Sequence, residues 1–251
     1  MIALYKKFKK YYSIGKSLDE NPVIKEAVKK SEFELNKNPK RSDVINFLLN
    51  SIKAPEKKYL EIGVRNPDHN FNKINAKTKY SVDPGIEFKD NPVDFPFTSD
   101  VFFEKLNNNA ILSTNIKFDV IFIDGLHLAE QVEKDIENSL KFLAEDGFIV
   151  LHDCNPPTEL SAREDYYFRF HCVMGFWNGT TWKAFFKYRQ KKELFSCCID
   201  SDWGIGIISK SKNIGQPTDF QNTFYEFNVL DKNRKESLNL ISFEELKRLL
   251  S

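Results

Sequence analysis

Apolar residues recur at intervals of three and four along the first 54 residues, with lysines between them. This spacing predicts amphipathic helices. Asn21-Pro22 and Asn38-Pro39 mark turns between them, because proline fits a bend or the first turn of a helix. The last of these helices is predicted over residues 42–52, with Ser42 as its cap and an apolar face of Val44, Phe47, Leu48 and Ile52. We therefore expect an N-terminal helical cap over residues 1–54.

From residue 57 the pattern changes to short runs that are apolar on both faces. These runs predict four strands, over residues 57–64, 79–85, 118–125 and 148–154. Between the last two, residues 130–147 predict a helix that ends at Gly147 and carries its apolar residues at Val132, Ile136, Leu140 and Leu143. Doubly apolar strands that alternate with helices are typical of a parallel sheet covered on both sides.

The remainder of the chain is less regular. Residues 178–189 predict a helix capped by Thr180 or Thr181, and residues 194–199 and 204–209 predict two strands joined by a short turn. A closing helix begins at Ser242, which forms a capping box with Glu245. We expect one domain, in which residues 55–210 form the core and residues 211–251 form a C-terminal extension.

Composition and charge narrow the class of protein. The chain has 251 residues, of which 41% are hydrophobic and 29% charged, so it can bury a sizeable core. The net charge of +1 does not favour binding to nucleic acid. No run reaches the roughly 18 to 20 apolar residues of a membrane span. The N-terminus is apolar first and basic afterwards, the reverse of a secretion signal. We therefore expect a cytoplasmic protein, and we interpret the basic stretch as a solvated helix face rather than a membrane contact.

The cysteines do not form a metal or redox motif. No pair has the C-x-x-C spacing of a zinc site, and two of the four are adjacent within an apolar run, where buried free thiols are expected. The four are Cys154, Cys172, Cys197 and Cys198.

Polar residues and a glycine stand where the predicted strands end, at Glu61, Gly63, Asp83, Asp124 and Asp153. Ligands of parallel α/β sheets bind beyond these carboxyl ends. Asp83 follows Gly63 by 20 residues, the position of a carboxylate that accepts hydrogen bonds from both hydroxyls of an adenosine ribose. Alternatively, Asp83 only forms an Asp-Pro-Gly turn. The lack of further glycines after Gly63 disfavours an NAD-dependent oxidoreductase.

Residues from about 58 to 208 resemble a class I S-adenosylmethionine-dependent methyltransferase of the methyltransferase family 24 type. The resemblance rests on the segments YLEIGV, YSVDPG, PFTSDVFF, FDVIFIDGLHLAEQVEKDIENSLKFLAEDGFIVLHDCNPP and NGTTWKA. It implies a doubly wound, mostly parallel, seven-stranded Rossmann-like sheet. A third strand would precede Ser99, and the last two strands would form an antiparallel hairpin at one edge.

The resemblance also implies that the cofactor is S-adenosylmethionine. By it, Glu61 and Gly63 would hold the methionine portion and Asp83 the ribose. Ser99 and Asp100 would lie near adenine, although the same residues can simply begin a helix. The resemblance adds Asp124 to the cofactor contacts.

Two histidines are the candidates for catalysis. His127 follows Asp124 by three residues, as the general base follows the metal-binding aspartate in related O-methyltransferases. Imidazole suits this role because its pKa is about 6.5, although His127 can instead cap the next helix. His152 is a second candidate base or a ligand. Asp124 and Asp153 suit Mg²⁺ or another divalent metal, with Asn155 in place of the oxygen ligand that Cys154 lacks.

The leading interpretation is an O-methyltransferase. The resemblance points to a sugar, or a sugar-linked substituent of a surface polysaccharide precursor, as the methyl acceptor. An N-methyltransferase of a small molecule and a non-catalytic adenosine-binding or scaffold protein are the alternatives. We expect a small-molecule or sugar partner, and a homo-oligomer is compatible with the sequence.

Overall fold

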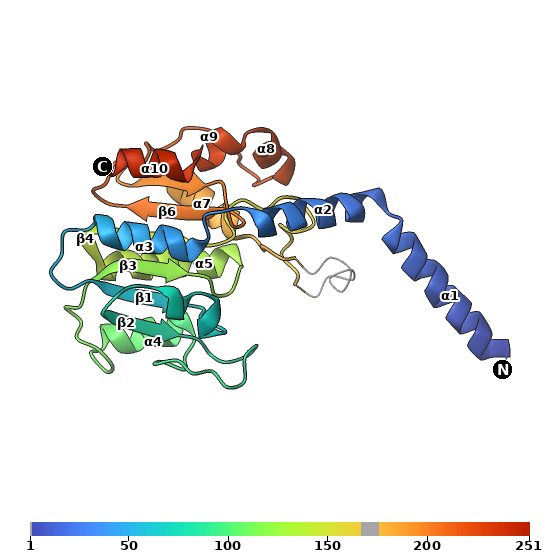
Figure 1. Cartoon of the computed structure of the whole chain (residues 1–251), viewed down its shortest axis with the longest axis horizontal. Coiled ribbons are helices and arrows are strands. Elements are labelled where there is room, and N and C mark those ends of the chain that lie inside the picture. Colours follow the sequence, from blue (N-terminus) through green and yellow to red (C-terminus); the bar gives the residue numbers. More distant parts are fainter. Residues whose placement is uncertain (1, 167–175) are drawn as a thin grey trace.

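The computed structural model describes residues 2–166 and 176–251, so Cys172 lies outside the described residues. The described strands form a seven-stranded sheet in the order β2-β1-β3-β4-β6-β5-β7 (Figure 1). β1 to β4 are parallel to one another, whereas β6 is antiparallel to both β4 and β5. The strands are β1 (Lys58–Ile62), β2 (Thr78–Val82), β3 (Phe118–Ile123), β4 (Leu143–Leu151), β5 (Phe195–Ile199), β6 (Ile205–Ser209) and β7 (Leu240–Ile241).

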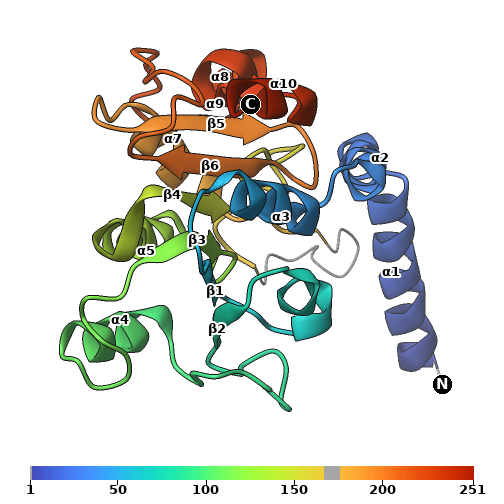
Figure 2. The same ribbon diagram turned by 60° about the vertical axis from the view of Figure 1, so that its left-hand side comes forward.

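Helices cover both faces of this sheet (Figures 1 and 2). One face packs on α3 (Arg41–Ser51) and α10 (Phe243–Leu249), through a core that includes Leu48, Phe122 and Leu246. The other face packs on α4 (Ser99–Asn107), α5 (Ala129–Phe142) and α7 (Thr181–Arg189). The other helices of the described residues are α1 (Ile2–Asp19), α2 (Pro22–Asn36), η1 (Pro67–His69), η2 (Phe71–Lys73), α8 (Phe227–Lys232) and α9 (Arg234–Leu238). The doubly wound α/β class expected from the sequence is confirmed.

The seventh strand is not the one that the sequence suggested. The segment before Ser99 forms only an isolated bridge between Phe95 and Val82, because its chain meets β2 at a single residue. The seventh strand is instead β7, from the C-terminal extension, which pairs with β5 outside the β5–β6 hairpin. The hairpin is therefore antiparallel as predicted, but β7 forms the sheet edge beyond it.

The predicted end of the helix over residues 130–147 is wrong. Helix α5 ends at Phe142, and β4 begins at Leu143. Leu143 pairs with Phe118 of β3, and the register shifts before Phe148 pairs with Val120. A Cβ atom on Gly147 would lie 2.8 Å from the Asp119 carbonyl oxygen. Gly147 therefore allows a close approach of two strands and does not terminate a helix.

The helix ends show which cap predictions hold. Asn21 caps α2 by accepting a hydrogen bond from the Val23 amide, and Ser242 caps α10 by accepting one from the Glu245 amide. The prediction for Ser42 is wrong, because α3 begins at Arg41 after the N-cap residue Lys40. There the Asp43 carboxylate accepts a hydrogen bond from the Lys40 amide and closes the first turn.

Helices α1 and α2 lead away from the sheet (Figure 1). Helix α2 is tied to the β5–β6 turn, because Lys37 forms ion pairs with Glu34 and Asp200 at 2.7 Å. Helix α1 has no buried residue. Within the described chain, every helix falls short of the length and hydrophobicity that a membrane-spanning helix needs.

Candidate functional site

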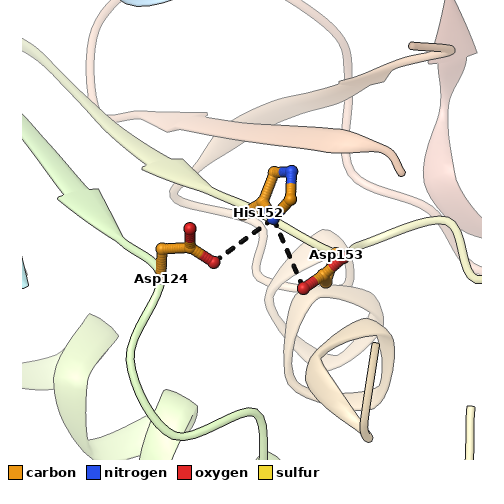
Figure 3. A group of neighbouring side chains, drawn as sticks. All are labelled: Asp124, His152 and Asp153. Atoms are coloured by element: carbon orange, nitrogen blue, oxygen red, sulfur yellow. Dashed lines mark ion pairs between the residues drawn. The ribbon is translucent and has the colours of Figure 1, made fainter. Parts of the chain in front are cut away.

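The carboxyl ends of β3 and β4 bring three predicted site residues together (Figure 3). Asp124 follows β3, and His152 and Asp153 follow β4. The His152 Nδ1 atom lies 3.2 Å from Asp124 Oδ1 and 3.3 Å from Asp153 Oδ2. Asp153 has a φ angle of 61°, a left-handed conformation that Asp tolerates better than most residues. The two carboxylates thus lie on either side of one imidazole nitrogen.

His127 joins the same two carboxylates from the loop between β3 and α5. Its Nε2 atom lies 3.3 Å from Asp124 Oδ1, and its Nδ1 atom lies 3.1 Å from Asp153 Oδ2. The Nδ1 atom is buried and, among the described residues, has no partner with hydrogen-bonding geometry. His127 does not cap α5, since the N-cap residue of that helix is Leu128.

A third loop, over residues 176–180, packs against His127. The indole of Trp177 stacks on the His127 ring with 5.2 Å between ring centroids. The Asn178 amide donates a hydrogen bond to Asp153 Oδ1, and Thr180 Oγ1 accepts one from the Ala129 amide at the start of α5. This loop therefore fixes both the His127 ring and the Asp153 carboxylate.

Arg41 and Asp202 complete the cluster from distant parts of the chain. Arg41 Nη1 lies 2.8 Å from His152 Nε2 and 3.5 Å from Asp202 Oδ2, and Arg41 Nε lies 3.9 Å from Asp124 Oδ2. The Asp202 carboxylate also accepts a hydrogen bond from the Arg41 amide at the start of α3. The guanidinium has donors only, so its contact with Nε2 is a hydrogen bond when that nitrogen carries a lone pair.

Burial and mutual charge shift the pKa values of this cluster in opposite directions. Burial raises the pKa of Asp124, but His152 and His127 outweigh it and hold that pKa well below its usual range. Burial lowers the pKa of His152 and of His127, but the nearby carboxylates outweigh it and raise both. Asp202 has a pKa of about 2, because His152 and Arg41 outweigh the effect of burial. The negative charge of the cluster thus needs a compensating positive charge, from protonated rings or from a bound cation.

Glu61 and Gly63 have structural partners at the end of β1. Glu61 is only 1% exposed, and its Oε2 atom accepts hydrogen bonds from the Tyr59 hydroxyl at 2.5 Å and the Asn70 amide at 2.9 Å. Burial raises the pKa of Glu61 to about 7. Gly63 has a φ angle of 85°, and a Cβ atom there would lie 2.4 Å from the Asp124 carbonyl oxygen. The close packing of the loop after β1 against the loop after β3 therefore requires glycine at this position, whether or not a cofactor binds there.

Asp83 holds two loops together at the end of β2. One carboxylate oxygen accepts a hydrogen bond from the Arg65 amide at 2.8 Å, and the other accepts one from the Gly85 amide at 2.7 Å. The second bond is the Asx turn that the alternative interpretation of Asp83 predicted. Each oxygen keeps a further lone pair, so the turn does not preclude a ligand.

Ser99 and Asp100 lie in the first turn of α4, which Thr98 caps. Both accept hydrogen bonds from the Gln131 side chain, at 3.1 and 3.0 Å, and Gln131 also donates to Asp135. These contacts tie α4 to α5. Ser99 and Asp100 thus begin a helix, as one interpretation predicted, and this position does not prevent them from contacting a ligand.

The structure does not bring Asn155 or the Cys154 thiol to the acidic cluster. Asn155 accepts a hydrogen bond from Arg234 and donates one to Asp200, on the far side of the β4 loop. The Cys154 sulfur faces the carbonyl oxygens of its own turn, 3.9 and 3.7 Å away. The amide at the cluster is Asn178, and the third group with a ligand atom near both carboxylates is His152.

Sequence reasoning missed Arg41, Asn178 and Asp202, because they come from segments outside the strand–helix units that define the site. For Arg41, one feature of the sequence could have indicated a role in the site. A cation at the first position of a helix opposes the positive end of the helix dipole, so it needs a specific partner. That partner is Asp202, 161 residues further along the chain.

The comparisons with known proteins agree with the resemblance. Residues 69–154 match the family model described as a methyltransferase domain. This match covers about a third of the chain and includes Asp83, Asp124, His127 and both residues of the His152–Asp153 pair. This segment therefore has the pattern of a methyltransferase domain, and the predicted class of enzyme is confirmed. No curated protein matches the chain.

Solved structures of similar shape are remote in sequence. An O-methyltransferase from Bacillus cereus in complex with SAH is 14% identical, with a TM-score of 0.40 over 75% of this chain and 90% of that chain. TomG, an O-methyltransferase from Streptomyces achromogenes in complex with SAM, is 13% identical, with a TM-score of 0.39 over 80% of this chain and 94% of that chain. Because these TM-scores are below 0.5, the fold class rests on the strand order itself.

Proposed function

We propose that this protein transfers a methyl group from S-adenosylmethionine to a hydroxyl oxygen of a small molecule. The observation that carries the proposal is the convergence of two carboxylates and two imidazoles at adjacent strand ends, where each imidazole lies within 3.3 Å of both carboxylates. Groups that can hold a proton and groups that can hold a cation are thus combined at the sheet edge where ligands of this fold class bind. A scaffold protein has no need for such buried charge.

Unpartnered acceptors near the β1 and β2 ends support the cofactor. Among the described residues, the buried Asn70 Oδ1 and Asn91 Oδ1 atoms have no hydrogen-bond partner. Asn70 contacts Glu61, and Asn91 donates to the Asp83 carbonyl oxygen. These oxygens can accept from the amino and hydroxyl groups of the cofactor, with Asp83 on the ribose and the Ser99–Asp100 turn near adenine. S-adenosylmethionine supplies an electrophilic methyl carbon.

In this proposal His127 removes the proton from the acceptor hydroxyl while the oxygen bonds to the methyl carbon. The sulfur leaves with the electron pair of the broken bond, as S-adenosylhomocysteine. Trp177 restricts the imidazole to one orientation, and the Asp124 and Asp153 charges stabilise the imidazolium that forms. His152 is more deeply enclosed, between the carboxylates and Arg41, and so is better suited to holding them in place.

The residues present also fit a divalent cation. Asp124, His152 and Asp153 each offer one ligand atom, and these atoms lie within 4.8 Å of one another. Asp202 lies 3.6 Å from His152 Nε2, where a second carboxylate commonly orients a ligating histidine. A mixed nitrogen and oxygen donor set suits Mn²⁺, Fe²⁺ or Zn²⁺ as well as Mg²⁺. When bound, the cation would orient and acidify the acceptor hydroxyl.

A sugar, or a sugar-linked substituent of a polysaccharide precursor, remains the proposed acceptor, and a cytoplasmic location goes with it. The proposed catalytic core spans residues 55–210. The flanking segments are attached to it, since α3 covers one face of the sheet and β7 extends its edge. An N-methyltransferase remains the alternative, and the product of the reaction distinguishes the two by the methylated atom.

The first test is cofactor binding. We expect S-adenosylmethionine and S-adenosylhomocysteine to stabilise the protein in a thermal melt, whereas NAD does not. At about 100 times the dissociation constant, the gain in unfolding free energy is about 2.7 kcal/mol. Asp83→Asn keeps one carbonyl acceptor for the turn but loses the charge and should weaken binding in calorimetry. A protein that melts at the same temperature with and without either sulfur compound contradicts the proposed cofactor.

The second test concerns His127. Glutamine keeps much of the bulk of histidine but cannot take a proton at neutral pH, so His127→Gln should lower kcat by about 10²- to 10⁴-fold. Its affinity for S-adenosylmethionine should change little. The exposed His69→Gln is the matched control and should retain full activity.

Full activity in His127→Gln rules out His127 as the base. If a chelator abolishes wild-type activity and added metal restores it, the cation is required as well. If both His127→Gln and the chelated wild type stay fully active, neither route operates, and simple positioning of the reactants accounts for catalysis.

A further inference from the structure

Helix α1 is an amphipathic helix that nothing in the described structure covers. Every residue of α1 is exposed except Leu18, which is partly buried. Among the described residues, α1 forms no hydrogen bond or ion pair with any other helix or strand; its hydrogen bonds and its ion pair reach no further than residues 20 and 21. Figures 1 and 2 show it projecting from the body of the protein.

The two faces of α1 have opposite chemistry. With 3.6 residues per turn, one arc holds Leu4, Tyr5, Phe8, Tyr11, Tyr12, Gly15 and Leu18, and is interrupted only by Asp19 in the last turn of the helix. Phe8 is 68% exposed and Tyr12 is 65% exposed. The rest of the surface carries five lysines, at positions 6, 7, 9, 10 and 16. With Asp19 as its single acid, α1 has a net charge of +4. The positive charge is largely unpaired.

We propose that α1 binds the surface of an anionic membrane. An aromatic and aliphatic face opposite a lysine-rich face is the pattern of helices that lie in the plane of a membrane interface. The apolar arc would enter the boundary between headgroups and acyl chains, where tyrosine and phenylalanine are favoured. The lysine stems extend along this boundary and bring their ammonium groups to anionic headgroups. Charge complementarity thus identifies the partner.

The uncovered face changes the interpretation that the sequence alone favoured. A solvated helix needs only a polar surface, yet the apolar arc of α1 leaves five large exposed side chains in water, at Leu4, Tyr5, Phe8, Tyr11 and Tyr12. Contiguous exposed apolar surface of this kind marks an interaction site. The lysines add an electrostatic attraction to an anionic surface, which a neutral surface would lack.

A second copy of the chain fits this face less well. Leu4, Phe8, Tyr11, Gly15 and Leu18 have the alternating spacing of four and three that a coiled coil requires. However, its seam would contain Gly15 and two aromatic rings where branched aliphatic residues are preferred. Tyr5 and Tyr12 would stay outside the seam.

The test measures binding of the full chain to vesicles by co-sedimentation. We expect binding to vesicles of phosphatidylcholine mixed with phosphatidylglycerol, weaker binding at high salt, and little binding to phosphatidylcholine alone. Lys6→Gln and Lys10→Gln should each lower the partition coefficient by about fivefold, from about 1 kcal/mol per lysine.

Phe8→Asp and Ser13→Asp form a matched pair, because both add one negative charge, on the apolar and the polar face respectively. Ser13→Asp should lower the partition coefficient about fivefold. Phe8→Asp should lower it at least about tenfold more than Ser13→Asp does, since it also removes a ring that would enter the membrane. A melting temperature equal to that of the wild-type protein checks that both variants fold. Absence of vesicle binding, or equal effects of the two variants, overturns the proposal. So does a vesicle-free dimer in sedimentation equilibrium that Phe8→Asp dissociates.

Discussion

The guanidinium of Arg41 enters the site from the first turn of α3 and lies between His152 and Asp202. Its position makes the N-terminal segment part of the site. Burial lowers the pKa of Arg41, but the charges of Asp124 and Asp202 outweigh it and raise that pKa. Arg41 therefore stays charged and offsets part of the negative charge of the cluster.

We expect Arg41→Met to destabilise the protein by about 3 kcal/mol, because removing one partner leaves buried charge uncompensated. Urea unfolding measures this cost. In the double variant Arg41→Met with Asp202→Asn, the total cost should be smaller than the sum of the two single costs. Strictly additive costs would show that the two side chains do not interact.

The site residues that could be predicted from the sequence are those that lie at or just after the end of a predicted strand of the parallel sheet. Asp124, His127, His152 and Asp153 follow two adjacent parallel strands, so the rule that ligands bind at carboxyl ends groups them correctly. Asn178 and Asp202 could not be found this way. They reach the cluster through loops whose course depends on tertiary packing, which local pattern does not encode.

At the scale of elements, Thr180 links the site loop to helix α5. It occupies the N-cap position of α7, yet its hydroxyl caps no residue of that helix. It accepts instead from the Ala129 amide, the first of α5, while its own amide donates to the His127 carbonyl oxygen. The expected cap of α7 therefore stabilises the start of a different helix.

Thr180→Val should destabilise the protein by about 1 to 2 kcal/mol, because the partly buried Ala129 amide loses its acceptor. Thr181→Val is the matched control. The Thr181 hydroxyl is also buried but has no hydrogen-bond partner among the described residues, so its loss should cost close to nothing. Chemical denaturation compares the two, and equal costs would contradict a specific role for Thr180.

Element boundaries were harder to predict than element types. The runs apolar on both faces correctly indicated β1 to β4, because burial on two sides leaves an unambiguous composition. The two further strands predicted over residues 194–199 and 204–209 match β5 and β6. The boundary between α5 and β4 was placed too late. Leu143 continues the helical spacing of Val132 and Ile136 but pairs with Phe118, so strand pairing overrides the local pattern.

At the scale of the whole molecule, the charges near the sheet edge make stability depend on pH. Glu61 is the clearest case, since burial raises its pKa to about 7 from an ordinary value of 4.5. The folded protein thus binds a proton that the unfolded chain releases at lower pH. By linkage, the contribution of Glu61 to stability is fully present below pH 4.5 and is lost as the pH rises towards 7.

We therefore expect Glu61→Gln to flatten the decline in unfolding free energy between pH 4.5 and 7 and to stabilise the protein above pH 7. The full difference is on the order of 3 kcal/mol, from a shift of about 2.5 units at 1.36 kcal/mol each. The glutamine carbonyl can accept the hydrogen bonds that Tyr59 and Asn70 donate to Oε2, so the packing should persist. Exposed Glu193→Gln is the control and should follow the wild type at every pH. Urea midpoints measured across this range test the prediction, and parallel curves for Glu61→Gln and the wild type would show that the folded protein does not hold a proton on Glu61.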